Sequence, residues 1–310
     1  MKNNQLMIYG AYGYAGELMV REAVAQGLRP IIAGRDDEKL KPIATELSLE
    51  CRAFGVRNTG SNLQDISVLL NCAGPFSATA EPLARACLAQ QIHYLDITGE
   101  IDIFRKCHAL DEEARQQNVL ILPGAGTDIV PTDCLAAMLK EKLPVATRID
   151  LALSFGTNPS IGTVNTMIES FGKGGLIREG GMLKVVSNAF QMRKIPFQNK
   201  PQWAMTIPWG DVFTSGISTG VPDGAVYMAM PRMSIYMIRL TNPVKGILNT
   251  QFGQKITKRL AGWLMKKGPD AKALEAGRGQ FWGEAEAPDG EKLEMTMSTP
   301  NVYALTATVG

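Results

Sequence analysis

The chain has 310 residues, of which 45% are hydrophobic and 20% charged, and its formal net charge is +2 at pH 7. This composition is ordinary for a globular protein, and the balanced charge argues against a nucleic-acid partner. The five cysteines include no Cys-x-x-Cys pair and only two histidines are present, so we expect no metal site. The sequence opens directly into a strand-like run and contains no apolar run of membrane-spanning length. We therefore expect a cytoplasmic protein without a signal peptide or a stable membrane span.

A glycine-rich stretch follows the first apolar run, Leu6 to Tyr9, and a helix-like pattern begins directly after it. Its sequence is Gly10-Ala11-Tyr12-Gly13-Tyr14-Ala15-Gly16. Strand, glycine loop and helix in this order are typical of a dinucleotide-binding unit. Gly10 permits a sharp turn, Gly13 leaves room for a pyrophosphate, and Gly16 lets the helix pack on the strand. The alternative is a structural turn without a ligand, since the first two glycines are three apart rather than the usual two.

Strand-like and helix-like segments alternate through the first half of the chain. Strands are predicted at 6–9, 30–34, 50–56, 66–72, 92–97 and 119–122, and helices at 14–26, 36–47, 79–91, 101–118 and 132–143. Alternation of this kind predicts an α/β fold with a doubly wound parallel Rossmann sheet. The sequence changes in character near Pro144, which predicts two domains, 1–143 and 144–310.

The second predicted strand ends in Ala33-Gly34-Arg35-Asp36, where such a sheet meets the adenosine ribose. An arginine at this position can pair with a 2′-phosphate, so Arg35 favours NADP over NAD, with Lys39 as a second positive charge. The alternative is a solvated surface arginine. A carboxylate of Asp36 turned toward the ribose would instead allow NAD.

The ends of the later strands supply the remaining candidate residues, because ligands of parallel sheets lie beyond the carboxyl ends of their strands. Gly74 and Pro75 predict a turn close to the cofactor, whereas Cys72 is interpreted as a small buried residue. Asp96 is either a site carboxylate or an acceptor for loop amides. The candidate cofactor-binding residues are Gly10, Tyr12, Gly13, Tyr14, Gly16, Arg35, Lys39, Asn71, Cys72, Ala73, Gly74, Pro75, Phe76, Thr98 and Gly99. The candidate catalytic residues are Tyr94, Asp96, Glu100, Asp128 and Asp133, and the sequence does not decide which of them is the acid.

The second half offers weaker patterns. A strand is predicted at 147–155, a helix at 160–170, and a strand pair at 280–286 and 292–297. The five glycines from Gly172 to Gly181 surround Lys173 and Arg178, which predicts either a solvated loop or a mobile lid for an anionic substrate. Three aromatic residues are expected to line a pocket or to belong to the core: Trp203, Trp209 and Phe213.

Several of these segments resemble the saccharopine dehydrogenase-like oxidoreductases, in particular the branch of the trans-acting enoyl reductases. The resemblance rests on 10–16, 33–35, 71–76, 94–100 and 123–133, and continues more weakly at 160–163 and 303–306. It implies an NADP-binding Rossmann domain followed by an α+β domain on a largely antiparallel sheet, which would cover the nicotinamide and form a homodimer.

The resulting hypothesis is an NADP-dependent oxidoreductase that transfers a hydride to a small or acyl substrate. Two alternatives remain: an amino-acid or imine reductase of the saccharopine type, and a non-catalytic NADP-binding sensor or partner subunit. Tyr303 to Gly310 resembles the start of a C-terminal helix in the family. Because so short a helix is marginal in water, we expect Leu305 to Gly310 to end a strand or fray, leaving an apolar surface open or filled by a neighbouring subunit.

Overall fold

The computed structural model describes residues 5–155, 174–240, 242–244, 250 and 277–309. The chain forms two compact units: Met1–Asp128 with Tyr303–Gly310, and Ile129–Val302. This division differs from a boundary at residue 143, because helix α6 (Val130–Lys142) packs on the sheet of the second unit.

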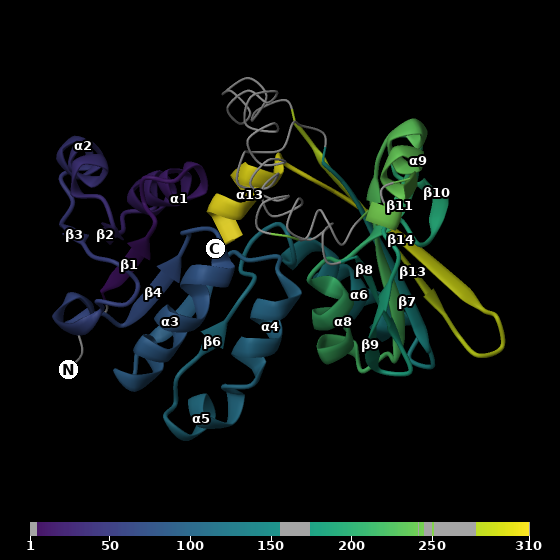
Figure 1. Cartoon of the computed structure of the whole chain (residues 1–310), viewed down its shortest axis with the longest axis horizontal. Helices are drawn as coiled ribbons and strands as arrows, with labels where there is room; N and C mark the ends of the chain where they lie inside the picture. The colour runs from purple at the N-terminus through teal and green to yellow at the C-terminus, as the bar shows by residue number, and fades with distance from the viewer. Residues whose placement is uncertain (1–4, 156–173, 241, 245–249, 251–276, 310) are drawn as a thin grey trace. The chain divides into compact units, whose positions relative to one another are not determined.

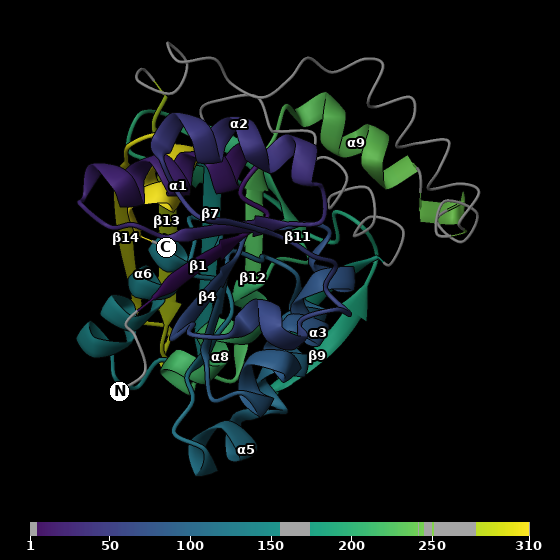
Figure 2. The ribbon, with the colours of Figure 1, turned by 90° about the vertical axis from the view of Figure 1, so that its left-hand side faces the viewer.

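The first unit is built on a six-stranded parallel sheet of order β3-β2-β1-β4-β5-β6, which confirms the predicted Rossmann fold (Figure 1). The strands are β1 (Leu6–Tyr9), β2 (Ile31–Gly34), β3 (Cys51–Ala53), β4 (Val68–Asn71), β5 (His93–Asp96) and β6 (Ile121–Leu122). Helices α1 (Tyr14–Ala25) and α2 (Asp37–Leu47) cover one face (Figure 2). The other face carries α3 (Phe76–Ala89), α4 (Ile101–His108) and α5 (Asp111–Gln116), and a 3-10 turn spans Gly60–Leu63.

Side chains alternate between these two faces along each strand, as extended backbone requires. In β1, Met7 and Tyr9 join the core under α3, whereas Ile8 joins the core under α1 and α2. Both faces are therefore apolar, which explains the near-continuous hydrophobic strands of the sequence.

Two predicted helices differ from the structure. Helix α3 begins at Phe76 rather than at Thr79: the Thr79 hydroxyl does not cap the helix but donates to the carbonyl of Ala73 (2.6 Å) and holds the preceding loop. The predicted helix 101–118 is two helices, α4 and α5. The second one starts at three consecutive acidic residues, Asp111 to Glu113, which favour a helix N-terminus.

The prediction of a frayed or strand-like end was wrong. Residues Val302–Val309 form helix α13, and from Tyr303 onward this segment belongs to the first unit. Ala307 packs against the core under α1 and α2, and the Thr306 hydroxyl bonds to Thr127. Tertiary contacts of this kind stabilise a helix that its own length would not.

The second unit contains a mixed sheet of order β10-β11-β12-β7-β13-β14, in which the pair β7–β12 is parallel and the remaining pairs along this path are antiparallel. This confirms the largely antiparallel second sheet. Its strands are β7 (Arg148–Phe155), β10 (Met192–Pro196), β11 (Pro201–Ile207), β12 (Asp223–Ala229), β13 (Gly279–Glu286) and β14 (Lys292–Thr299). Strand β8 (Gly175–Glu179) pairs with β12 and with β9 (Met182–Val186). The remaining elements are α8 (Asp211–Thr219), α9 (Arg232–Leu240) and a 3-10 turn at Asn242–Val244.

Within the glycine-rich segment 172–181, residues Gly175–Glu179 form strand β8, so neither predicted alternative holds for Arg178. This side chain is 4% exposed, and its guanidinium donates to the carbonyls of Val212 and Val221 and to the hydroxyl of Ser215. Lys173 and the predicted helix 160–170 lie outside the described residues. Of the aromatic residues, Trp209 packs against Phe155, and Trp203 lies under the guanidinium of Arg232. Phe213 lies in α8.

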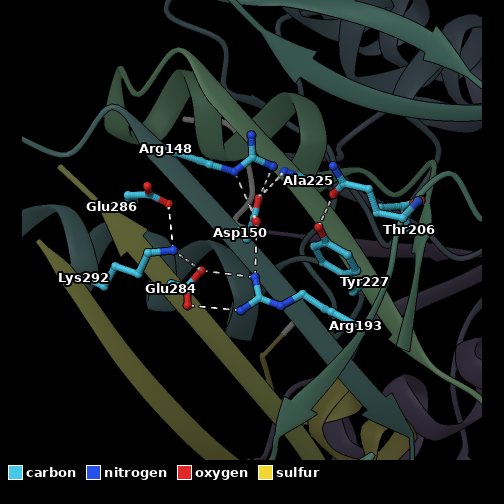
Figure 3. A network of polar contacts seen from close by, with 10 residues as sticks. Arg148, Asp150, Arg193, Thr206, Ala225, Tyr227, Glu284, Glu286 and Lys292 are labelled. Carbon is cyan, nitrogen blue, oxygen red and sulfur yellow. Dashed lines mark hydrogen bonds and ion pairs between the residues drawn. The ribbon is translucent and has the colours of Figure 1, made fainter. Parts of the chain in front are cut away.

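A network of charged side chains crosses the second sheet from β10 to β14 (Figure 3). The guanidinium of Arg193 donates to both carboxylate oxygens of Glu284, each at 3.1 Å, and lies 3.5 Å from the carboxylate of Asp150. Arg148 pairs with Asp150 at 2.9 Å, and Lys292 lies 3.7 Å from Glu284. Burial alone would raise the pKa of Glu284, but Arg193 and Lys292 outweigh it and lower that pKa.

Replacement of Arg193 by methionine is expected to destabilise the protein by about 2 kcal/mol, because the carboxylates of Asp150 and Glu284 lose their shared partner while buried. The effect is smaller than for a fully buried pair, since the Arg193 side chain is 33% exposed. The free energy of unfolding from denaturant titration measures it. Lys292→Met is the control, since this half-exposed cation should contribute less to stability than Arg193 does. If both substitutions lowered the free energy of unfolding equally, Arg193 would not be the main stabilising cation of this network.

Candidate functional site

The glycine loop between β1 and α1 has the backbone geometry of a phosphate-binding turn. The amides of Gly10 and Ala11 both donate to the carbonyl of Ala33 at the end of β2, at 2.7 and 3.2 Å. Gly13 is the N-cap of α1, its amide donates to the carbonyl of Gly10 (2.9 Å), and no side chain caps the helix. The first-turn amides have no acceptor within the helix, so they can receive an anion.

Two glycines of this loop are needed for close backbone approach. Gly10 has φ +84°, and a β-carbon there would lie 2.7 Å from the nitrogen of Ala73. A β-carbon at Gly16 would lie 2.2 Å from the carbonyl oxygen of Gly10. Gly10 thus allows the β1 and β4 loops to meet, and Gly16 allows α1 to pack against the turn. At Gly13 the nearest atom would be the Gly10 oxygen at 3.1 Å, so its missing side chain leaves space beside the loop.

Arg35 directly follows β2 and is exposed. Over the part of the chain that the structure describes, its guanidinium makes no hydrogen bond or ion pair. The Tyr12 ring lies against Gly34, where a β-carbon would be 2.6 Å from the ring edge. Lys39 lies 5.6 Å from the centroid of that ring, but its ammonium is paired with Asp36 at 3.1 Å. Of the two predicted phosphate-binding cations, Arg35 is available and Lys39 is already paired.

The β4 loop is held by side chains on both sides of it. The Asn71 carboxamide oxygen accepts the amide of Ala73 (3.0 Å), and the Thr79 hydroxyl holds the carbonyl of the same residue. The peptide bond between Gly74 and Pro75 is cis, and α3 starts at Phe76. The carboxylate of Glu100 accepts the amide of Phe76 at 3.2 Å. Glu100 therefore caps α3, which is a structural contact for a predicted catalytic residue.

Tyr94, Asp96 and Thr98 lie on one face at the end of β5 and are all fully buried, as their alternation predicts. The carboxylate of Asp96 accepts three hydrogen bonds: from the amides of Thr98 and Gly124, each at 3.0 Å, and from the hydroxyl of Tyr94 at 2.8 Å. The same hydroxyl accepts from the carboxamide nitrogen of Asn71 (3.1 Å). Burial raises the pKa of Asp96 to about 6 although these donors favour its ionised form. Asp96 thus acts as an acceptor for loop amides and joins the β5 and β6 loops.

Asp128 ends the β6 loop and lies beside the loop that follows β5. A β-carbon at Gly99 would be 3.4 Å from a carboxylate oxygen of Asp128. The side chain is half-buried, and burial raises its pKa to about 6. A carboxyl group with this pKa exchanges a proton near neutral pH, as an acid–base group requires.

Two other predicted residues are placed differently. Asp133 belongs to α6 in the second unit, where its carboxylate accepts the hydroxyl of Ser218 at 2.6 Å. Cys72 is buried among apolar side chains and the pKa of its thiol is raised by burial, in agreement with its interpretation as a packing residue.

Sequence reasoning missed Thr79 as a loop anchor and the amide of Gly124 as a partner of Asp96. Both contacts involve backbone groups of loops, and a hydrophobic repeat in the sequence does not reveal such contacts. Within the described ranges, no group of three or more His, Cys, Asp or Glu is arranged to hold a metal ion. Among the helices of those ranges, none is long and apolar enough to cross a membrane.

Comparison with known proteins shows which family these features resemble. Residues 6–122 match the saccharopine dehydrogenase NADP binding domain. Saccharopine dehydrogenase-like oxidoreductases from Rattus norvegicus and Homo sapiens are each 25% identical, over 231 and 233 residues, which is 65% of this chain and 53% of each relative. A Mycobacterium tuberculosis protein, whose name describes a trans-acting enoyl reductase, is 28% identical over 205 residues, 59% of this chain and 44% of that protein. The chain therefore spans about half the length of these relatives.

The fold also resembles a solved structure, the apo saccharopine dehydrogenase (L-Glu forming) from Saccharomyces cerevisiae. The TM-score is 0.64 with 9% identity, over 98% of this chain and 89% of that one. At this identity the match shows a shared fold.

Proposed function

Since residues 6–122 belong to the saccharopine dehydrogenase NADP-binding domain family, we propose that the chain is an NADP-dependent oxidoreductase that transfers a hydride to carbon of a small or acyl substrate, as in an enoyl reductase. When bound, the nicotinamide supplies the hydride. The residues of this chain bind the cofactor, hold its loops in place and provide a proton.

Two features together carry the proposal. The N-terminus of α1 has no side-chain cap, and Arg35 is exposed and has no partner among the described residues. The loop amides at the start of α1 suit a pyrophosphate, and the guanidinium suits a 2′-phosphate. At Gly10 and Gly16 the backbone lies so close to neighbouring backbone atoms that a side chain would not fit, as this motif requires.

The hydrogen-bonded residues of the β4, β5 and β6 loops would orient the nicotinamide end. Asp96 and Asn71 hold loop amides, and Glu100 caps α3, so we assign these side chains to positioning rather than to proton transfer. Asp128 remains as the candidate proton donor, because its pKa is raised to about 6 and it lies beside Gly99.

Asp128→Asn is expected to lower kcat by about 100-fold or more while the NADPH dissociation constant stays within about threefold, since general acid catalysis contributes roughly this much. In the parent protein the acid is protonated below its pKa, so kcat should fall as pH rises through about 6. The variant should lose this limb of the pH profile. Glu113→Asn, on the exposed helix α5, is the control. An unchanged pH profile in Asp128→Asn would exclude this residue as the acid.

Oxidation of NADPH against separate panels of enoyl thioesters and imino acids tests the reaction class. Turnover of enoyl thioesters supports the proposal, whereas turnover of imino acids alone would favour a saccharopine-type reductase. Tight NADPH binding without turnover on either panel, together with altered partner binding, would identify a non-catalytic sensor or partner subunit. A homodimer and a cytoplasmic location stay predictions, which sedimentation of the purified protein and localisation in cells would check.

A further inference from the structure

Helix α13 lies beside the start of α1 in the first unit. The ring of Tyr303 meets the ring of Tyr14 edge to face, with centroids 5.1 Å apart and an interplanar angle of 90°. Tyr14 is the first residue of α1 and directly follows Gly13 of the phosphate loop. Helix α13 therefore contacts the first helical residue after the loop that the proposed function assigns to the pyrophosphate.

The same helix also holds the loop after β6. The Thr306 hydroxyl donates to the hydroxyl of Thr127 at 2.9 Å and accepts the amide of Thr127 at 3.1 Å. The methyl group of Thr306 fits against Gly126, where a β-carbon would lie 3.3 Å away. Thr127 immediately precedes Asp128, so Thr306 fixes the backbone that carries the candidate proton donor.

We propose that α13 is a positioning element of the cofactor site, with Tyr303 supporting the phosphate loop and Thr306 supporting the loop of Asp128. This inference rests on the proposed NADP(H) binding. The eight residues of α13 contact both the start of α1, beside the phosphate loop, and the loop that carries Asp128. Docking of the helix and binding of the cofactor therefore favour each other. Such coupling is reciprocal: the docked helix raises affinity for the cofactor, and the cofactor lowers the frequency with which the helix opens.

The helix is suited to this coupling because its stability comes from docking. An isolated helix of this length is marginal in water, so α13 depends on its contacts with Tyr14, Thr127 and the core under α1. Opening of a short helix that is held mainly by its docking contacts costs less free energy than unfolding of the central sheet. Cofactor binding can thus change its exchange rate without unfolding the protein.

The test uses the full chain and measures the NADPH dissociation constant by titration calorimetry, alongside Tm. Tyr303→Ala should raise this constant about 3- to 10-fold, the range expected from loss of an aromatic pair, whereas Tyr303→Phe keeps the ring and should stay within about twofold. Thr306→Val keeps the shape but leaves the Thr127 amide without this acceptor, so a rise of about 10-fold is expected. The matched control is Thr308→Val on the exposed side of the same helix, which should leave the constant unchanged.

Hydrogen exchange of the parent protein supplies an independent measurement. NADPH should slow exchange of the amides in 303–309 at least about threefold, while exchange in the remote helix α5 stays unchanged. If the parent protein fails to bind NADPH, the proposed function falls and this inference falls with it. If the parent binds but Tyr303→Ala and Thr306→Val lower only Tm and leave the dissociation constant unchanged, the helix is merely structural and this inference alone is overturned. Unchanged exchange in 303–309 on NADPH binding would also overturn it.

Discussion

Arg35→Asp is expected to raise the NADPH dissociation constant by about 10- to 100-fold while changing that for NADH by less than about threefold. The substitution removes a charge-assisted hydrogen bond to the 2′-phosphate, which contributes about 1.5–3 kcal/mol, and adds a repelling carboxylate. NADH has no 2′-phosphate, so its affinity depends on the glycine loop, which this change does not touch. Titration of both cofactors against both proteins measures the change in preference.

Arg105→Asp provides the matched control for this experiment. Arg105 is an exposed residue of α4, so the substitution changes the net charge equally away from the end of β2. It should leave both dissociation constants within about twofold. If Arg35→Asp weakens both cofactors equally, Arg35 does not recognise the 2′-phosphate and the predicted preference for NADP loses its support.

Gly10→Ala is expected to have the largest effect on stability of the changes considered. The added β-carbon would lie 2.7–2.8 Å from backbone and side-chain atoms of Ala73, at a residue whose φ is +84°. Backbone strain and overpacking both oppose it, because β1 and β4 cannot separate without breaking their parallel pairing. We expect a loss of about 2–5 kcal/mol in the free energy of unfolding, together with loss of cofactor binding.

Gly27→Ala separates these two causes. Gly27 has nearly the same φ, +85°, but a β-carbon there would have no atom within 4 Å. This control should cost only the strain of the left-handed conformation, about 1–2 kcal/mol, and leave cofactor binding intact. Denaturant unfolding of both variants gives the comparison. Equal losses at the two positions would mean that the close approach of Gly10 to Ala73 is unimportant.

The cofactor end of the site was the part most accessible from sequence. Its residues lie within one strand–loop–helix segment, so the order of Tyr9, Gly10, Gly13 and Gly16 along the chain already describes their arrangement in space. Arg35 directly follows a strand in the structure, as its place in the sequence indicated, and its role in phosphate binding stays a prediction. The state of Lys39 was not, because its pairing with Asp36 is decided by rotamers rather than by spacing.

The candidate catalytic residues were harder to separate by sequence. Asp96, Glu100 and Asp128 are all acidic residues at strand ends, and only their partners distinguish them. The Asp96 carboxylate accepts loop amides, Glu100 caps a helix that starts 24 residues earlier, and Asp128 is half-buried beside Gly99. Asp133 illustrates the limit of chain proximity: five residues after Asp128, it belongs to the other compact unit.

The Rossmann sheet could be predicted from the amino-acid pattern, because buried parallel strands and glycine turns impose local patterns of hydrophobicity and backbone freedom. Contacts between distant parts of the chain instead set the helical conformation of 303–309, the burial of Arg178 and the hydrogen-bond partners of the acidic residues. The short apolar segment 303–309 is helical because it bonds to Thr127 and packs against the core under α1. Arg178 is buried because its guanidinium donates hydrogen bonds to three oxygen acceptors. These outcomes depend on partners distant in the chain, whose contact free energies exceed the weak preferences of the local sequence.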